Sequence, residues 1–280
     1  MSVQLLAVLI NVALAVMKFT VGTIAASHAL IADAFNSTGD VVATFVAWLA
    51  FRYGAKPPDD DHHYGHANAE ALAGLLIGGT ICATGVFICA DGMRASLAER
   101  EHVAPEALAL WGAGVTAVVK EMLYRVSHRV GVVTSSPTLL ASANDHRADV
   151  VAALVALVGV WIARSGFPQF DAIAAIAIGI YIFFLGLEPL RSNLGILMHA
   201  APPHLDKRAA EVAAKIPGVV MVRQVRVQPL GGMFRMDMVL TVSSGLTVGA
   251  AHAIAHAVED AVRQGVENVI EVHVHVEPAP

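Results

Sequence analysis

The sequence has few charged residues and almost no cysteine. Of its 280 residues, 15% are Asp, Glu, Lys or Arg and 56% are hydrophobic, which is outside the range of ordinary soluble domains. The 2 cysteines, Cys82 and Cys89, form no CxxC pair, so neither a zinc-thiolate site nor a disulfide framework is expected. The net charge of −5 comes with no cluster of basic residues, and nucleic acid is therefore not expected as a partner. These absences leave membrane lipid as the expected surroundings of much of the chain.

Six apolar segments are each long enough to cross a membrane, because about 20 mainly apolar residues span roughly 30 Å of hydrocarbon. They are residues 3 to 25, 27 to 51, 69 to 92, 106 to 127, 138 to 164 and 169 to 190. The first segment lacks a basic flank and a cleavage site of small residues, so we interpret it as a span and not as a signal peptide. We predict that all six segments are transmembrane helices.

The pattern changes after Ala201-Pro202-Pro203. Hydrophobic periodicity predicts helices at 206 to 215 and 247 to 263, and strands at 219 to 228, 234 to 242 and 269 to 277. We therefore predict a transmembrane domain at 1 to 200 and a small cytoplasmic α+β domain at 201 to 280. The expected fold class is a polytopic α-helical membrane protein with a soluble C-terminal domain.

Positive charges near the ends of the spans predict the orientation, because cytoplasmic loops carry an excess of Lys and Arg. One side has Arg52, Lys56, Lys120, Arg125, Arg129 and Arg191, and the other has Arg94, Arg100 and Arg164. This excess places both termini in the cytoplasm, as an even number of spans also requires. We expect a multi-pass protein of a bacterial inner membrane.

Two predicted spans contain polar residues at helical spacing. Asn36 and Asp40 in the second span, and Asp145 and Asp149 in the fifth, are four residues apart, so each pair shares one helix face. A rise of about 1.5 Å per residue places both pairs roughly 12 to 20 Å from the start of their spans, near mid-membrane. Ionisable groups there are costly and commonly mark an ion path. Three carboxylates at one depth repel one another unless they are protonated or bridged by a cation, so we predict a divalent metal site.

The alternative is a structural role, in which these residues cap helices, pair with Arg147 and Lys18, or join helices by hydrogen bonds. Two pairs at matching depth favour the metal site. Asp33, nearer the outer end of its span, is left outside the site as a residue that stabilises the helix or lines an entrance. His146 is adjacent to Asp145, and a small helix rotation could place its imidazole in the site instead.

Two segments resemble the signatures of a known family. Residues 27 to 40, SHALIADAFNSTGD, and residues 144 to 150, NDHRADV, resemble the second-span and fifth-span signatures of the cation diffusion facilitators. Six spans followed by a small cytoplasmic domain also match, and the resemblance covers nearly the whole chain. It implies a homodimeric exporter that exchanges cytoplasmic metal for protons by alternating access, with a ferredoxin-like C-terminal domain similar to metallochaperones.

By position, the transport site of that family falls on Asn36, Asp40, Asp145 and Asp149. Zinc-transporting members typically have His at the first or third of these positions, and this chain has His at neither. An all-oxygen donor set suits Mn²⁺ better than Zn²⁺, and the combination resembles the manganese-exporting branch. We expect a divalent metal as substrate and protons as counter-ion, with no organic cofactor. Mn²⁺ is favoured, and Zn²⁺, Fe²⁺, Co²⁺ and Cd²⁺ are the alternatives.

The loop after the second span aligns with a second metal site of the family. The aligned residues are Asp59, His62 and His66, and the two histidines are four residues apart, so they can share a metal on one helical turn. A solvated polar loop is the alternative. Asn68 stands where the family often has Lys.

The resemblance also assigns regulatory metal binding to the tail. Of the family's ligand positions, His252, His275 and Glu277 remain, whereas Arg223 and Val239 stand at two others. His256 and His273 lie close enough in sequence to compensate. Ordinary surface histidines on a dimerising domain are the alternative, because isolated histidines are weak indicators of a site.

Two functions of other classes stay open. An intramembrane metal-dependent hydrolase would use similar residues to activate water, but no HExxH or comparable nucleophile motif is present. A non-transporting metal sensor would bind the metal and rearrange its tail without a counter-flow of protons. We expect a secondary transporter and not an enzyme.

Overall fold

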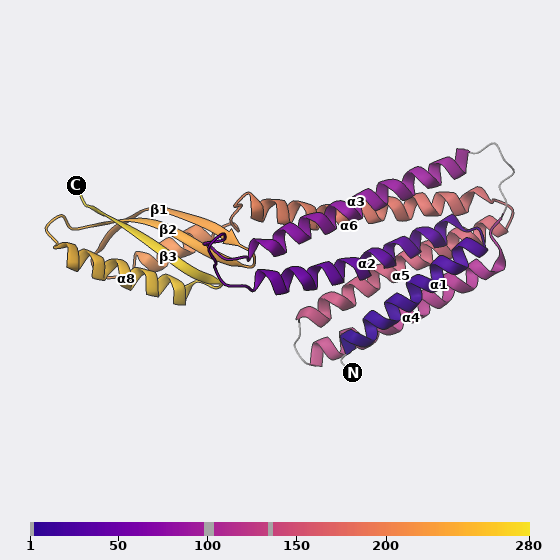
Figure 1. The fold of residues 1–280 in the computed structure, drawn as a ribbon, viewed down its shortest axis with the longest axis horizontal. Coiled ribbons are helices and arrows are strands. Elements are labelled where there is room, and N and C mark those ends of the chain that lie inside the picture. The colour runs from indigo at the N-terminus through magenta and orange to yellow at the C-terminus, as the bar shows by residue number, and fades with distance from the viewer. Residues whose placement is uncertain (1–2, 98–103, 134–136) are drawn as a thin grey trace. The chain divides into compact units, whose positions relative to one another are not determined.

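A computed structural model describes residues 3–97, 104–133 and 137–280 (Figure 1). Arg100, one of the cations counted for orientation, lies outside the described residues. The helices and strands follow in the order α1 (Val3–Ile24), α2 (His28–Gly54), α3 (Asn68–Leu97), α4 (Ala107–Val133), α5 (Pro137–Arg164), α6 (Gln169–Leu197), α7 (Leu205–Ala213), β1 (Val219–Leu230), β2 (Met233–Val242), α8 (Val248–Gly265) and β3 (Val269–Pro278). The chain forms two compact units, residues 1–46 with 77–189 and residues 47–76 with 190–280.

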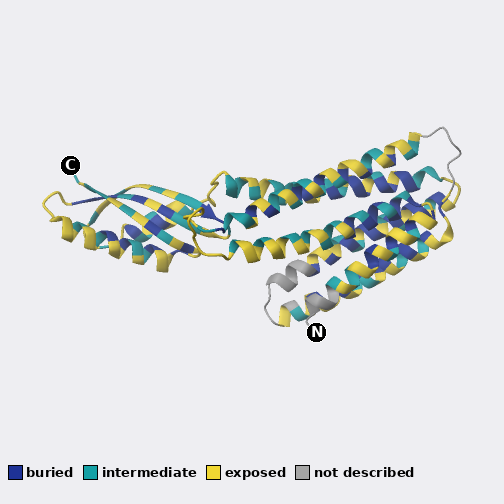
Figure 2. Ribbon diagram, in the orientation of Figure 1, coloured by how far each residue is buried: buried dark blue, intermediate teal, exposed yellow. Residues whose placement is uncertain are grey.

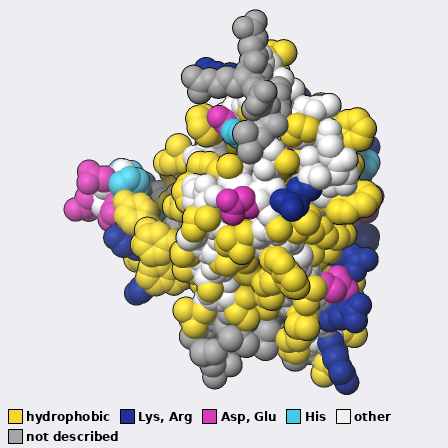
Figure 3. Space-filling view, turned by 90° about the vertical axis from the view of Figure 1, so that its right-hand side faces the viewer, with side chains coloured by type: hydrophobic (Ala, Val, Ile, Leu, Met, Phe, Trp, Pro, Cys, Tyr) yellow, Lys and Arg dark blue, Asp and Glu magenta, His cyan; other side chains and the backbone are white. Residues whose placement is uncertain are grey.

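Helices α1 to α6 coincide with the six predicted spans. Among the described residues, four helical stretches are long and apolar enough to cross a membrane: Asn68–Leu97, Ala107–Val130, Ala143–Arg164 and Gln169–Leu197. The polar residues Asp33, Asn36, Asp40 and Arg52 interrupt the apolar sequence of helix α2. Large hydrophobic side chains are exposed along the helices, Trp111 by 73%, and they dominate the face in Figure 3. Such a surface fits lipid and not water.

A short turn of residues 25 to 27 joins α1 to α2 and is fixed by polar contacts. Ala26 adopts the left-handed backbone conformation with φ 52°, and Ser27 N donates to the Gly22 carbonyl at 3.0 Å. At the start of α6, the Asp171 carboxylate accepts hydrogen bonds from Ser27 Oγ and His28 N, both at 2.6 Å. These contacts tie the beginnings of α2 and α6 together.

Helices α3 and α6 approach each other through small residues. A Cβ added to Gly85 would lie 2.6 Å from Phe183 N, and one added to Gly179 would lie 2.8 Å from Cys89 Sγ. Cys82 Sγ donates to the Phe183 carbonyl at 3.5 Å. Both cysteines are free and fill this contact, as small residues do between membrane helices.

The C-terminal segment folds as an α+β sheet with two helices. Strand β1 pairs antiparallel with β2, and β2 pairs parallel with β3, so α8 is the crossover connection that a parallel pair requires. The core gathers Met236, Met238, Leu240, Val258 and Val262, all nearly fully buried. Figure 2 shows buried, dark blue stretches in the sheet and helices of this segment. The predicted α+β fold is confirmed.

Candidate metal transport site

The structure joins the two predicted helix-face pairs through one hydrogen bond. Asn36 Nδ2 on α2 donates to Asp149 Oδ1 on α5 at 2.9 Å. Both side chains are buried, with 8% of Asn36 and 6% of Asp149 exposed. Residues 113 positions apart in sequence thus meet between α2 and α5.

A buried lysine occupies the other oxygen of the same carboxylate. Lys120 Nζ on α4 lies 2.5 Å from Asp149 Oδ2, and the Lys120 side chain is 0% exposed. Its inclusion among the cations at the cytoplasmic ends of the spans was wrong, because it lies inside the helix bundle. The sequence pattern does not indicate that Lys120 is a partner of Asp149, since a lone Lys near a predicted span end is usually a flanking charge.

Asp40 and Asp145 lie near this pair without converging on one point. Asp40 interacts electrostatically with Asp149, Lys120 and Asp145, and Asp145 interacts with Asp149 and Lys120. The Asp145 side chain is exposed. In the described part of the chain, the transmembrane carboxylates are not among the groups whose ligand atoms all lie within 4.8 Å of one another. Asn36 and Asp149 are joined by a hydrogen bond, and Asp40 and Asp145 are electrostatic neighbours of Asp149.

Two further residues adjoin the site. Tyr181 on α6 interacts electrostatically with Asp149, Asp40 and Asp145. Tyr181 was not among the residues predicted from the sequence, although a polar aromatic residue in an apolar span can indicate a site. His146 is buried, and neither of its ring nitrogens has a hydrogen-bond partner among the described residues. Its imidazole also interacts with Lys120 and Asp149, which keeps it a possible nitrogen donor.

A second ion pair is buried between α1 and α2. Lys18 Nζ lies 2.9 Å from Asp33 Oδ2, with both side chains 0% exposed. The same ammonium donates to Ser37 Oγ at 2.7 Å and to the Asp33 carbonyl at 3.1 Å. Asp33 therefore joins two helices, which supports leaving it out of the metal ligands.

The loop residues Asp59, His62 and His66 form a compact three-ligand group, which we call the loop site. Asp59 Oδ1 lies 3.1 Å from His62 Nδ1, and Asp59 Oδ2 lies 3.3 Å from His66 Nε2. One ligand atom from each residue lies within 4.8 Å of the others. A carboxylate and two imidazoles at this separation can bind one divalent ion.

The loop site is held by its own backbone and by one aromatic contact. Hydrogen bonds from the backbone N–H of His62 and Asp61 to Asp59 Oδ1 lower the pKa of Asp59. The His66 ring packs edge-on against Tyr53, with centroids 4.9 Å apart. His66 is buried, whereas Asp59 and His62 are exposed, so a metal would enter from the Asp59 side.

The same loop contacts the α+β domain. Arg235 of β2 lies over the Tyr64 ring, 4.9 Å from its centroid. Gly231 N donates to Asn68 Oδ1 at 3.2 Å. Asn68 thus makes a neutral hydrogen bond to the tail at the position where the family often has Lys.

We expect metal bound at the loop site to be released on acidification, because metal ligands bind only in their deprotonated forms and protons therefore compete with the metal. Asp59 has a lowered pKa, so its carboxylate keeps its charge as the pH falls below neutral. Metal binding measured against pH in wild type and His62→Ala tests this. Wild-type binding that is flat down to pH 5 would contradict it.

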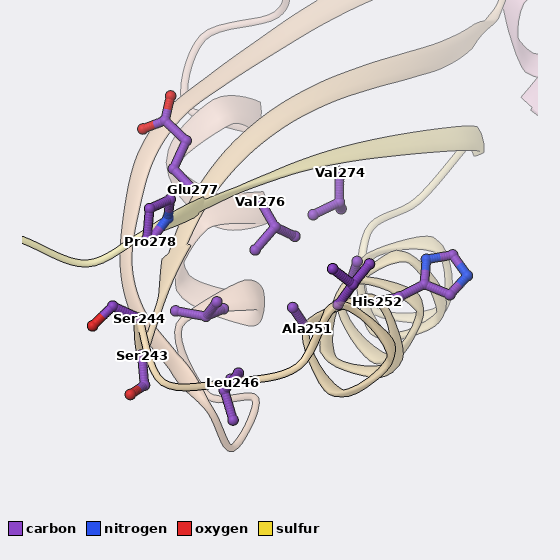
Figure 4. A pocket seen from close by; sticks show the side chains of 12 residues that line it. Ser243, Ser244, Leu246, Ala251, His252, Val274, Val276, Glu277 and Pro278 are labelled. Carbon is purple, nitrogen blue, oxygen red and sulfur yellow. The ribbon is translucent and has the colours of Figure 1, made fainter.

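The predicted tail residues do not converge. His252 Nε2 lies 3.0 Å from His256 Nε2 on α8, and Glu277 forms an ion pair with Arg223. His275 Nε2 lies 3.9 Å from Glu277 Oε1. Figure 4 shows His252 and Glu277 on opposite sides of one pocket, with the imidazole directed away from the carboxylate. The tail site stays a prediction.

Comparisons with known proteins cover nearly the whole chain. Residues 4–198 match the cation efflux transmembrane domain, and residues 202–279 match the cytoplasmic domain of cation efflux proteins. The manganese efflux system protein MneP of Bacillus subtilis is 30% identical over 99% of this chain and 95% of its own length. The manganese efflux system protein MneS of the same organism is 27% identical over 95% and 91%, respectively. The magnetosome protein MamB of Paramagnetospirillum magneticum is 28% identical over 96% of this chain and 91% of its own length.

Proposed function

The chain belongs to the cation efflux family, and from this premise we propose that it exports a divalent metal ion, preferentially Mn²⁺, in exchange for protons. The observation that supports this most directly is the buried contact between Asn36 and Asp149, with Asp40 and Asp145 as electrostatic neighbours. Members of this family are metal cation transporters. The transporter hypothesis is therefore stronger than the hypothesis of an intramembrane hydrolase. The metal is the substrate, and no step requires an organic cofactor.

In this proposal, metal from the cytoplasm binds Asn36, Asp40, Asp145 and Asp149. Asp145 is exposed and Asp149 is buried, so an ion would meet Asp145 first and reach Asp149 last. Because Asn36 Nδ2 donates to Asp149 Oδ1, the amide oxygen is the atom that Asn36 can offer to a metal. Protons compete for the same carboxylate oxygens, and a change between inward-open and outward-open states then couples their uptake to metal release.

Manganese is favoured because the four proposed ligands offer only oxygen, whereas Zn²⁺ prefers nitrogen and sulfur. The similarity to MneP and MneS supports the same choice, since both are named for manganese efflux. Similarity to MamB keeps other metals open. His146 is the nearby nitrogen donor that would shift the preference towards Zn²⁺ or Fe²⁺ if it replaced Asp145.

We further propose a homodimer in a bacterial inner membrane with both termini in the cytoplasm. The match of residues 202–279 to the cytoplasmic domain of cation efflux proteins supports this placement and a dimer. The loop site would gather cations near the cytoplasmic entrance. The tail residues His252, His275 and Glu277 would bind regulatory metal only after Glu277 leaves Arg223.

A competition assay tests the proposed substrate. Proteoliposomes carrying the protein would be loaded with a metal-sensitive dye and supplied with Mn²⁺, Zn²⁺, Fe²⁺, Co²⁺ or Cd²⁺ across a pH gradient. We expect Mn²⁺ to be carried fastest and to be the strongest competitor. Transport of Zn²⁺ with none of Mn²⁺ would overturn the choice of metal, and a flux unaffected by collapsing the pH gradient would overturn the antiport.

A further inference from the structure

We propose that Lys120 is a tethered cation that holds the place of the metal on Asp149, and that the metal must displace its ammonium group in order to bind. This inference rests on the proposed function, because it concerns the carboxylate proposed there as a transport ligand. It assigns Lys120 a specific role in the transport cycle, as an internal competitor that weakens metal binding and helps to empty the site.

The geometry leaves Asp149 no unoccupied oxygen. Asp149 Oδ1 accepts a hydrogen bond from Asn36 Nδ2 at 2.9 Å, and Asp149 Oδ2 lies 2.5 Å from Lys120 Nζ. Asp149 and Lys120 are both buried, so water does not readily substitute for either contact. Each oxygen has a second lone pair, but a metal ion that binds Oδ2 would lie within a few ångströms of the Lys120 ammonium and would repel it. Oδ2 already faces a cation, the Lys120 ammonium. A metal cation can therefore replace the ammonium there, so that one positive partner is exchanged for another.

The charges of the cluster around Asp149 fit one divalent ion. Asp33, Asp40, Asp145 and Asp149 bring four carboxylates, and Lys18 and Lys120 bring two ammonium groups. When all are ionised, the cluster has a formal charge of −2. A single divalent metal neutralises this charge, whereas without Lys120 a charge of −3 would attract the metal more strongly.

Repulsion between the metal and the ammonium would move Lys120 away from Asp149 when the metal binds. Two cations a few ångströms apart inside a protein repel each other strongly, because the surroundings screen them less than water does. The long, flexible side chain of lysine allows the ammonium to move aside. When the metal leaves, the same attraction to Asp149 returns the ammonium to Oδ2. Lys120 thus opposes rebinding of the metal, which a fixed structural ion pair would not do.

The test compares Mn²⁺ affinity with transport rate in purified full-length protein. In Lys120→Met we expect Mn²⁺ to bind at least about tenfold more tightly, which corresponds to about 1.4 kcal/mol, while the maximal rate of Mn²⁺ flux falls by a similar factor. Lys120→Gln keeps a hydrogen-bond donor without the charge and should behave in the same way. Lys120→Arg keeps the charge and should bind Mn²⁺ with an affinity closer to that of wild type.

Controls separate this site from others. His62→Ala and His66→Ala in every variant remove the loop site, and a matched series with Asp149→Ala identifies the binding that depends on Asp149. Arg125→Met removes one positive charge from the same helix, where Arg125 is exposed and paired with Glu121. It should leave Mn²⁺ affinity unchanged.

The outcomes distinguish this inference from the proposed function. If wild type carries Mn²⁺ but folded Lys120→Met and Lys120→Gln bind it no more tightly than wild type does, the inference fails and the proposed function stands. If wild type carries no divalent metal, the proposed function itself fails. Should both variants fail to fold, a structure of the Mn²⁺-loaded wild type decides. Lys120 Nζ must then lie beyond ion-pair distance of Asp149 Oδ2, and an intact pair overturns the inference.

Discussion

Asp149→Ala is expected to reduce Mn²⁺ flux by about 100-fold or more. The substitution removes a proposed ligand, leaves the Asn36 amide without its acceptor and leaves the Lys120 ammonium buried without its carboxylate. Loss of an outer-shell partner alone typically costs 10- to 100-fold in metal affinity or activity, so loss of a ligand should cost at least as much. Asp40→Ala should have a comparable effect, because it removes a second carboxylate. Dye-loaded proteoliposomes measure both.

The matched control is Asp91→Ala. Asp91 is an exposed aspartate of α3 that contacts His28, with Oδ2 3.0 Å from His28 Nδ1, and it should keep nearly full flux. Each variant must elute from a size-exclusion column in detergent as a folded protein, so that a reduced flux cannot be caused by loss of folded protein. Wild-type Mn²⁺ flux in both Asp40→Ala and Asp149→Ala would exclude these carboxylates from transport.

Asp33→Leu is expected to destabilise the helical unit by about 3 to 5 kcal/mol. Removing one partner of a buried ion pair leaves the other charge uncompensated. Lys18 is completely buried, and its remaining polar contacts, to Ser37 Oγ and the Asp33 carbonyl, carry no negative charge. Thermal unfolding in detergent should show a large decrease in the midpoint temperature.

The double variant Lys18→Met with Asp33→Leu should recover most of that stability, because replacing a whole buried pair by apolar residues is often neutral or stabilising. A double-mutant cycle gives the coupling. On the exposed surface of α8, Asp260→Leu breaks the pair with Arg263 and should cost under about 1 kcal/mol. Equal destabilisation by Asp33→Leu and Asp260→Leu would contradict the structural role given to Lys18 and Asp33.

The helices and strands could be predicted from sequence because each depends on a local pattern. Long apolar runs specify α1 to α6 with little reference to their neighbours. The alternation in β3 and the periodicity of α8 similarly specify the C-terminal domain. The pairing of Asn36 with Asp149 could also be anticipated, since four-residue spacing and matching depth constrain two antiparallel helices.

Contacts that depend on helix rotation could not be predicted. Lys120 reaches Asp149 from α4 only because that face of α4 is turned towards α5, and an isolated lysine gives no indication of such a rotation. Tyr181 adjoins the same carboxylates for the same kind of reason. The exposed tail histidines have many rotamers of similar energy, so sequence neighbours such as His275 and Glu277 need not converge.

The position of bound manganese tests the central claim most directly. The measurement is anomalous X-ray scattering at the manganese edge from crystals of Mn²⁺-loaded protein, with the loop site removed by His62→Ala and His66→Ala. We predict a manganese peak between α2 and α5 in contact with the carboxylates of Asp40, Asp145 and Asp149, absent in crystals that also carry Asp149→Ala. A protein that carries Mn²⁺ but shows no peak there, or keeps the peak without Asp149, would contradict the account.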